Sequence, residues 1–147
     1  LKKLFEIEIP EITSGIIEIK SVAREAGSRA KVAVYSAVPN IDTVGACIGQ
    51  RGARIKNIVD ELNGERIDIV EWKPVVEEFV SAVLSPAVVS NVTILEDGTA
   101  RVLVEPSQLS LAIGKNGQNA RLAARLTGMR VDIKVIDNET LKEEENE

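Results

Sequence analysis

The sequence predicts an α+β protein built from two copies of one small domain, each with a three-stranded sheet packed on helices. A repeated motif is the first observation: residues 48–69 read IGQRGARIKNIVDELNGERIDI and residues 113–133 read IGKNGQNARLAARLTGMRVDI. The second is that β-branched runs typical of strands precede each copy, while helical apolar periodicity lies within it. Two copies, each about as long as a small domain, indicate a duplicated domain rather than a solenoid.

The first copy shows the expected elements in order. Asp42 is a suitable N-cap for a short helix. An apolar stripe then recurs at helical spacing from Ile55 to Leu62, and Gly64 is placed to end that helix. By symmetry with the second copy the chain should open with a helix, although residues 6–9 alternate as a strand would. The expected elements are a helix at 1–8, strands at 15–23 and 30–38, helices at 43–48 and after Gly52, and a strand at 66–71.

The second copy repeats this order. Pro74 suits the first turn of a helix, and Pro86 ends it. Asp97-Gly98 is a strong signal for a hairpin turn. The expected elements are a helix from 74 to 84, strands at 87–95 and 100–105, helices at 107–113 and 118–126, and a strand at 130–135.

Composition narrows the function classes. The 147 residues include no His and one Cys, which excludes His-based catalysis, a disulfide framework and a Cys-based zinc site. No cofactor is expected. No apolar run approaches the roughly 20 residues that span a membrane, so we expect a cytoplasmic protein with no membrane partner.

The net charge of −5 comes entirely from residues 137–147, since residues 1–136 hold 17 bases and 17 acids. We expect an acidic, disordered tail there. An acidic chain is therefore weak evidence against a nucleic-acid partner. We expect a first domain at 1–72, a second at 73–136 and the tail at 137–147.

A Gly-x-x-Gly sequence lies between the two helices of each copy, as Gly49-Gln50-Arg51-Gly52 and as Gly114-Lys115-Asn116-Gly117. Glycine lets a ligand approach the main chain closely. The second glycine opens a helix whose free N–H groups and positive dipole end favour phosphate. A single GxxG is common by chance and can be only a tight turn between helices. Its repetition in the same context favours a ligand-binding role.

The stretches VGACIGQRGARIKNIVDELNGERIDIVEW and LSLAIGKNGQNARLAARLTGMRVDI resemble the tandem KH region of the NusA family of bacterial transcription termination/antitermination factors. The resemblance covers about residues 4–135. It implies two consecutive type II (prokaryotic) KH domains that bind single-stranded RNA, the nascent transcript. It also implies contacts with RNA polymerase and other elongation factors through the full-length protein. The RNA-binding residues carried over are Gly49, Gln50, Arg51, Gly52, Gly114, Lys115, Asn116, Gly117, Gln118, Asn119 and Arg121. Arg54 is a further candidate because of its charge, although a solvated helix face is the alternative for Arg54 and Arg121.

Side-chain chemistry leaves some roles open. Aromatic residues make up only 3% of the chain and none lies in a GxxG sequence, so base stacking on exposed rings is not expected there. An aliphatic groove is the alternative, lined by Ile48, Ile55, Ile113 and Ala120, although these residues could also be ordinary core. Three bases near the first hairpin could touch RNA, but a solvated loop is favoured for them: Arg24, Arg29 and Lys31.

Two rival functions remain. An enzyme is disfavoured because the carboxylates are scattered and no Gly-x-x-x-x-Gly-Lys-Ser/Thr sequence is present. The stronger rival is a protein-interaction or ribosome-associated KH module with little RNA affinity of its own.

Overall fold

The computed structural model describes residues 1–136. The predicted acidic, disordered tail at 137–147 lies outside the described residues. The chain divides into two compact units, Leu1–Pro74 and the residues from Val75 onward. Each unit is described by itself.

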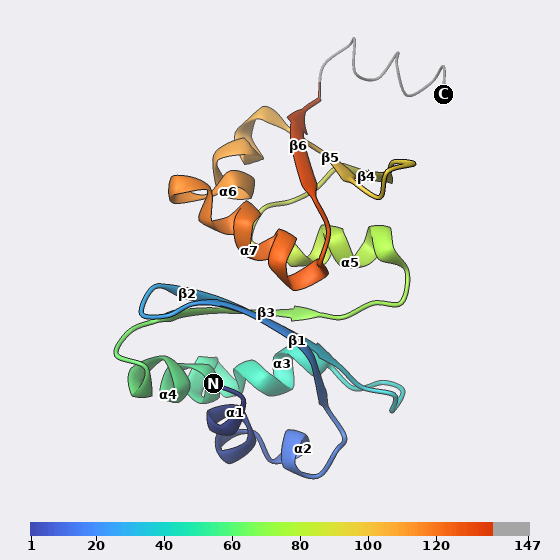
Figure 1. The fold of residues 1–147 in the computed structure, drawn as a ribbon. Coiled ribbons are helices and arrows are strands. Elements are labelled where there is room, and N and C mark those ends of the chain that lie inside the picture. The colour runs from blue at the N-terminus through green and yellow to red at the C-terminus, as the bar shows by residue number, and fades with distance from the viewer. Residues whose placement is uncertain (137–147) are drawn as a thin grey trace. The chain divides into compact units, whose positions relative to one another are not determined.

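Unit 1 has its helices on one face of a three-stranded sheet (Figure 1). Strand β2 is central, with β1 antiparallel on one side and β3 parallel on the other. Parallel neighbours need a crossover connection, and α3 and α4 with the GxxG turn between them provide it. The elements are α1 (Lys2–Glu8), α2 (Pro10–Thr13), β1 (Glu18–Glu25), β2 (Arg29–Tyr35), α3 (Thr43–Ile48), η1 (Gln50–Gly52), α4 (Ala53–Glu61) and β3 (Arg66–Glu71).

Unit 2 repeats this topology with β5 central, β4 antiparallel to it and β6 parallel. Helices α5, α6 and α7 pack on the sheet. The elements are α5 (Val76–Val83), β4 (Asn91–Ile94), β5 (Ala100–Val104), η2 (Pro106–Gln108), α6 (Leu109–Ile113), η3 (Lys115–Gly117), α7 (Gln118–Thr127) and β6 (Val131–Val135).

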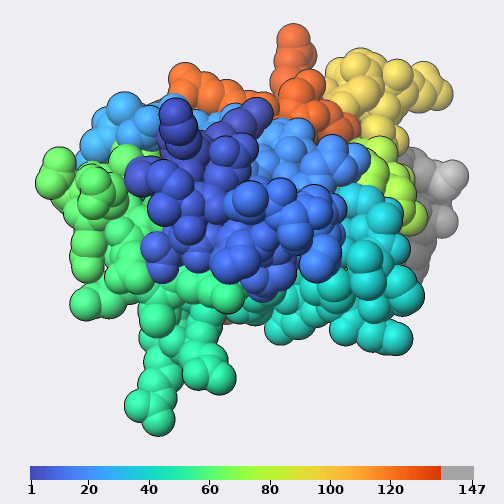
Figure 2. All heavy atoms as spheres, turned by 90° about the horizontal axis from the view of Figure 1, so that it is seen from below, coloured from blue at the N-terminus to red at the C-terminus, as the bar shows by residue number. Residues whose placement is uncertain are grey.

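The core of unit 1 joins the leading helices to the sheet and to the helices around the GxxG turn. Alternate residues of β2, Val32 and Val34, are fully buried among Phe5 of α1, Cys47 of α3 and Ile58 of α4. The space-filling view shows the dark blue N-terminal segment lying beside the green residues of α4 (Figure 2). Burial of this apolar surface therefore fixes α3 and α4, and with them the turn that connects the two helices.

The largest difference from the predicted elements is in unit 2. The strand expected at 87–95 covers only Asn91–Ile94, because the preceding backbone N–H groups bond elsewhere: Ala87 N donates to Leu84 O (3.0 Å) and Val88 N to Gln108 Oε1 (2.9 Å). The leading segment is helical, as symmetry predicted, and a second short helix, α2, follows it.

The three bases near the first hairpin do not form a solvated loop. Lys31 is 0% and Arg29 5% exposed, and both form ion pairs with the Asp68 carboxylate. Burial lowers the pKa of Lys31, and the charge of Asp68 opposes that change. Arg24 pairs with Glu65, at 2.8 Å from its Nε to Oε2. These side chains connect strands and loops within unit 1.

Glu65 is expected to make unit 1 sensitive to acid. Its carboxylate is 0% exposed and accepts hydrogen bonds from Arg24 Nε and Nη2 and from Gly27 N. The Arg24 hydrogen bonds hold the pKa of Glu65 below its ordinary value. A lowered folded pKa stabilises the protein above the unfolded pKa of about 4.3, and that stability is lost as the pH falls through the folded value.

Replacing Glu65→Gln should therefore lower the free energy of unfolding of unit 1 at pH 7 by about 2 kcal/mol and by much less at pH 3. The chain contains one Trp, Trp72 in unit 1, so its fluorescence during urea unfolding reports this unit. An equal loss of stability at both pH values would show that the carboxylate charge is not the cause.

Candidate nucleic-acid interface

The two GxxG turns have nearly the same backbone conformation. Gly49 and Gly114, the first glycines, have φ/ψ of 80°/172° and 79°/167°. Arg51 and Asn116, at the third position, have 55°/27° and 56°/26°. Gly52 and Gly117, the second glycines, have 73°/17° and 74°/12°. Two sequences with different middle residues thus form one shape, which indicates that both turns serve the same purpose.

The first glycine of each turn is required for two reasons. Its φ lies in the left-handed region that side chains rarely adopt. In addition, a Cβ atom on Gly49 would lie 3.0 Å from the backbone N of Arg54, and one on Gly114 would lie 2.7 Å from the backbone N of Asn119. The turn therefore packs directly against the first turn of the helix that follows it.

The helices that begin at these turns lack a side-chain cap. Their first N–H groups, on Ala53 and Gln118, donate to Gln50 O and Lys115 O within the turns. Neither α4, with nine residues, nor α7, with ten, has a side-chain hydrogen bond at its N-cap. Helix α3 is different, because Asp42 Oδ1 accepts a hydrogen bond from Gly45 N at 3.0 Å. An uncapped helix N-terminus with its positive dipole end suits a phosphate group.

The middle residues of both turns are exposed: Gln50, Arg51, Lys115 and Asn116. One cation per turn, Arg51 or Lys115, therefore stands beside an uncapped helix start. Arg121 on α7 is also exposed and donates from Nη1 to Asn116 O at 3.0 Å, which holds a second cation at the second turn. Gln118 lies half-buried at the start of the same helix. The arrangement favours an anionic ligand.

Two residues expected to bind RNA have internal partners instead. Asn119 is 0% exposed, and its Nδ2 donates to Leu84 O (3.1 Å) and Ala112 O (3.0 Å). Arg54 Nη1 donates to the Glu11 carboxylate and to Ala46 O. The structure does not support a direct RNA contact for the side chain of Asn119, because it is enclosed. For the other predicted residues, contact with RNA remains a prediction.

The aliphatic residues before each first glycine are not ordinary core. Ile48 is 36% and Ile113 39% exposed, at the ends of α3 and α6. Ile55 and Ala120, one turn into the following helices, are half-buried. An apolar rim therefore accompanies each turn, which fits the expected groove for bases better than the alternative of a closed core.

Aromatic side chains lie elsewhere. Phe5 and Phe79 are buried. Tyr35 and Trp72 form an edge-to-face pair with ring centroids 5.3 Å apart, near the ends of β2 and β3. Base recognition at the turns would therefore depend on aliphatic contacts and hydrogen bonds rather than on stacking.

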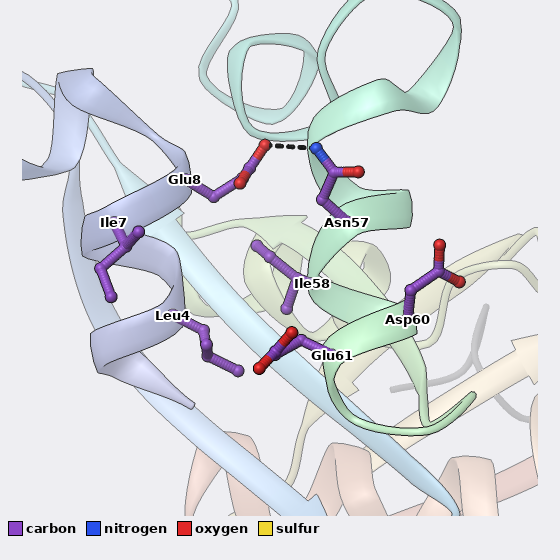
Figure 3. Close-up of a pocket in the computed structure, with 7 residues that line it drawn as sticks. All are labelled: Leu4, Ile7, Glu8, Asn57, Ile58, Asp60 and Glu61. Carbon is purple, nitrogen blue, oxygen red and sulfur yellow. Dashed lines mark hydrogen bonds between the residues drawn. The ribbon is translucent and has the colours of Figure 1, made fainter.

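One pocket was not anticipated from the sequence. It lies between α1 and the C-terminal half of α4 (Figure 3), with a cavity volume of about 560 Å³. Leu4, Ile7 and Ile58 supply its apolar surface, while Glu8, Asp60 and Glu61 supply carboxylates. Because carboxylates repel phosphate, this pocket is not suited to RNA. The most exposed large hydrophobic residue at this pocket is Ile7, which is 73% exposed.

Other sites are absent from the described part of the chain. Residues 1–136 contain no cluster of three or more Cys, Asp or Glu side chains that could hold a metal ion. Burial raises the pKa of the Cys47 thiol to about 11, so this thiol is protonated at neutral pH. No helix in residues 1–136 has both the length and the apolar character needed to cross a bilayer.

Comparison with known families agrees with this geometry. Residues 1–72 match the model of the NusA-like first KH domain, and residues 76–141 match that of the NusA-like second KH domain. The chain belongs to the NusA-like KH family. The resemblance drawn from the GxxG stretches is confirmed, as is the predicted α+β fold of two consecutive KH domains.

Relatives that match along most of this chain carry the same family name. The chain is 56% identical over 135 residues to the transcription termination/antitermination protein NusA of Halalkalibacterium halodurans, covering 91% of this chain and 35% of that protein. The NusA protein of Bacillus subtilis gives 56% identity over 135 residues, with 91% and 36% covered. That of Rickettsia conorii gives 46% over 149 residues, with 99% and 30% covered. The NusA-like chain thus spans about a third of the length of these relatives.

Among solved structures, the crystal structure of APE1850 matches with a TM-score of 0.65 and 22% identity, covering 90% of this chain and 96% of that one. At this identity the match shows a shared fold. The NusA-like KH pair therefore has both close sequence relatives and a structural counterpart of similar extent.

A strained residue distinguishes the two turns. Arg51 has φ 55° where the second turn has Asn116 at φ 56°, and asparagine tolerates this left-handed region better than arginine. Replacing Arg51→Asn should raise the free energy of unfolding of unit 1 by about 0.5–1 kcal/mol, measured by Trp72 fluorescence in urea. The same variant should bind RNA more weakly because it loses a cation. A destabilised variant would contradict the strain argument.

Proposed function

We propose that this chain binds single-stranded RNA through its two GxxG turns, as the RNA-binding part of a transcription termination/antitermination factor. The observation that carries the proposal is the pair of turns with nearly identical backbone angles, each opening a helix without a side-chain cap. Such a helix start binds phosphate, and a KH turn holds the backbone of about four nucleotides. The names of the NusA relatives support the role in transcription.

The contacts with RNA are assigned to the exposed residues of each turn and to the helix starts. In this proposal the domains are residues 1–72 and 73–136. The phosphates contact the backbone of Gly49, Gln50, Arg51, Gly52, Gly114, Lys115, Asn116 and Gly117, with Gln118 and Arg121 beside the second turn. The ligand is the nascent transcript in the cytoplasm. RNA polymerase and other elongation factors are partners of the full-length protein. The chain acts by binding and catalyses no reaction.

A protein-interaction role is the second candidate, and the pocket in Figure 3 favours it. The exposed Ile7, beside the half-buried Leu4, offers apolar surface of the kind that proteins bury in contacts. This surface lies on α1 and the far half of α4, whereas the turn lies at the start of α4, so the two roles are compatible.

A comparison of single-stranded with duplex RNA tests the proposal. Fluorescence anisotropy should show an eight-nucleotide single strand binding at least about tenfold more tightly than the same sequence in a duplex, since a KH turn takes an unpaired strand. A four-nucleotide single strand should bind more weakly than the eight-nucleotide strand, because it is long enough to occupy only one turn. Equal affinity for single strand and duplex would instead indicate nonspecific attraction to phosphate.

A further inference from the structure

The fifth residue after the first glycine holds each turn in the same way, although its chemistry differs between units. Arg54 in unit 1 and Asn119 in unit 2 occupy this position. Each donates to a carbonyl of the short helix before the turn: Arg54 Nη1 to Ala46 O at 2.9 Å, and Asn119 Nδ2 to Ala112 O at 3.0 Å. Both side chains therefore cross from the helix after the turn to the helix before it.

The same side chains also reach the N-terminal helical layer of their unit. Arg54 Nη1 contacts both oxygens of Glu11 in α2, at 3.1 and 2.9 Å. Asn119 Nδ2 donates to Leu84 O, directly after α5, at 3.1 Å. One donor group in each unit therefore joins three segments: the short helix before the turn, the helix after the turn, and the segment that precedes the first strand, which is α2 in unit 1 and the end of α5 in unit 2.

Both residues also fill the space beside the first glycine. A Cβ atom on Gly49 would lie 3.0 Å from Arg54 Cβ and 2.8 Å from its Cγ, and one on Gly114 would lie 2.8 Å from Asn119 Cβ. The glycine thus lies directly against the side chain that holds the helices together. A shift of that side chain would alter the backbone of the turn, which is the part proposed to contact the phosphates.

We propose that Arg54 and Asn119 are positioning residues of the two RNA-binding turns. They act on RNA affinity through the shape of the turn and do not touch the RNA. This inference rests on the proposed function for its effect on RNA, whereas the effect on the free protein can be measured without any ligand.

The most discriminating variant is Glu11→Ala, because the two roles of Arg54 predict opposite results. If the Arg54 guanidinium were an RNA contact, removing its carboxylate partner would free a cation and strengthen RNA binding. If Arg54 positions the turn, losing the partner loosens the turn and weakens binding by about threefold to tenfold, the range expected for one hydrogen bond. Glu6→Ala on α1 is the matched control, since it removes an exposed acid from the same unit.

Amide hydrogen exchange of the free chain gives an independent result. Glu11→Ala should speed exchange at residues 49–53, and Asn119→Ser, whose side chain is too short to reach both carbonyls, should speed it at residues 114–118. Glu6→Ala should leave both turns unchanged. If Asn119→Ser does not fold, Glu11→Ala still decides the role of the position in unit 1.

The two measurements together distinguish a positioning role of Arg54 from a direct contact with RNA. Weaker binding by Glu11→Ala together with faster exchange at its turn supports the positioning role. Stronger or unchanged RNA binding, or exchange no faster than in Glu6→Ala, overturns it. If the unaltered chain binds no eight-nucleotide RNA, the proposed function fails. The exchange result then still establishes or refutes that these side chains hold the turns.

Discussion

Aspartate pairs at both turns are expected to abolish RNA binding. Replacing Gln50-Arg51 and Lys115-Asn116 by Asp-Asp puts four carboxylates beside the uncapped starts of α4 and α7, where they compete with phosphate for the same N–H groups. Two cations are lost as well. The affinity for an eight-nucleotide single strand should fall by about a hundredfold or more. Anisotropy titration at fixed salt measures this loss.

The fold should survive these changes. All four positions are exposed, and aspartate adopts the left-handed conformation of the third position more readily than most residues. Changing one turn at a time should leave weaker binding through the other turn. The charge control is Lys2→Asp with Lys3→Asp on α1, which also replaces two exposed cations by acids and lowers the net charge by four, against three for each single-turn variant. If this control lost as much affinity as the turn variants, the effect would be one of overall charge only.

The first glycine of each turn is expected to be far less replaceable than the second. Gly49→Ala must accommodate a Cβ atom 2.8 Å from Arg54 Cγ with φ at 80° and ψ at 172°, a conformation almost confined to glycine. The free energy of unfolding of unit 1 should fall by about 3 kcal/mol. For Gly52→Ala the nearest atom, Ile55 Cγ2, is 4.0 Å away, so only the left-handed conformation opposes it, at about 1 kcal/mol.

Urea unfolding followed by Trp72 fluorescence compares these two variants directly in unit 1. The same contrast should hold for Gly114→Ala against Gly117→Ala, because a Cβ atom would meet Asn119 at 2.7 Å in the first case and only Arg121 Nη1 at 3.9 Å in the second. Circular dichroism reports both units, so an unfolding transition that it shows and that Trp72 fluorescence does not show belongs to unit 2. Equal losses at the first and second glycines would mean that contact with the following helix does not constrain the turn.

The repeat made most of the fold predictable from sequence. Local sequence pattern predicted α4, α7 and the strands β3 and β6. The parallel pairing of these strands with β2 and β5 was not predicted. The role of Glu65 was not predictable, because its partners Arg24 and Gly27 lie 41 and 38 positions away. The ion pairs of Lys31 and Arg29 with Asp68 were missed for the same reason.

The residues at the turns were predicted by motif, and motif alone does not separate contact from support. One signal for Asn119 was present in the sequence. It lies three, four and seven positions before Leu122, Ala123 and Leu126, which are all buried on one face of α7. A polar residue on that stripe is expected to face the core with internal hydrogen-bond partners. The structure shows such partners for Asn119 Nδ2, whereas its buried Oδ1 has none among residues 1–136.

Whether RNA contacts the two GxxG turns can be measured by NMR titration of the ¹⁵N-labelled chain with an eight-nucleotide single-stranded RNA. The amide signals of residues 49–55 and 114–120 should shift with RNA concentration. The signals of Ile7 and Glu61, at the acidic pocket, should stay in place. If signals at the pocket or elsewhere shifted while those of both turns did not, RNA would bind at a surface other than the turns.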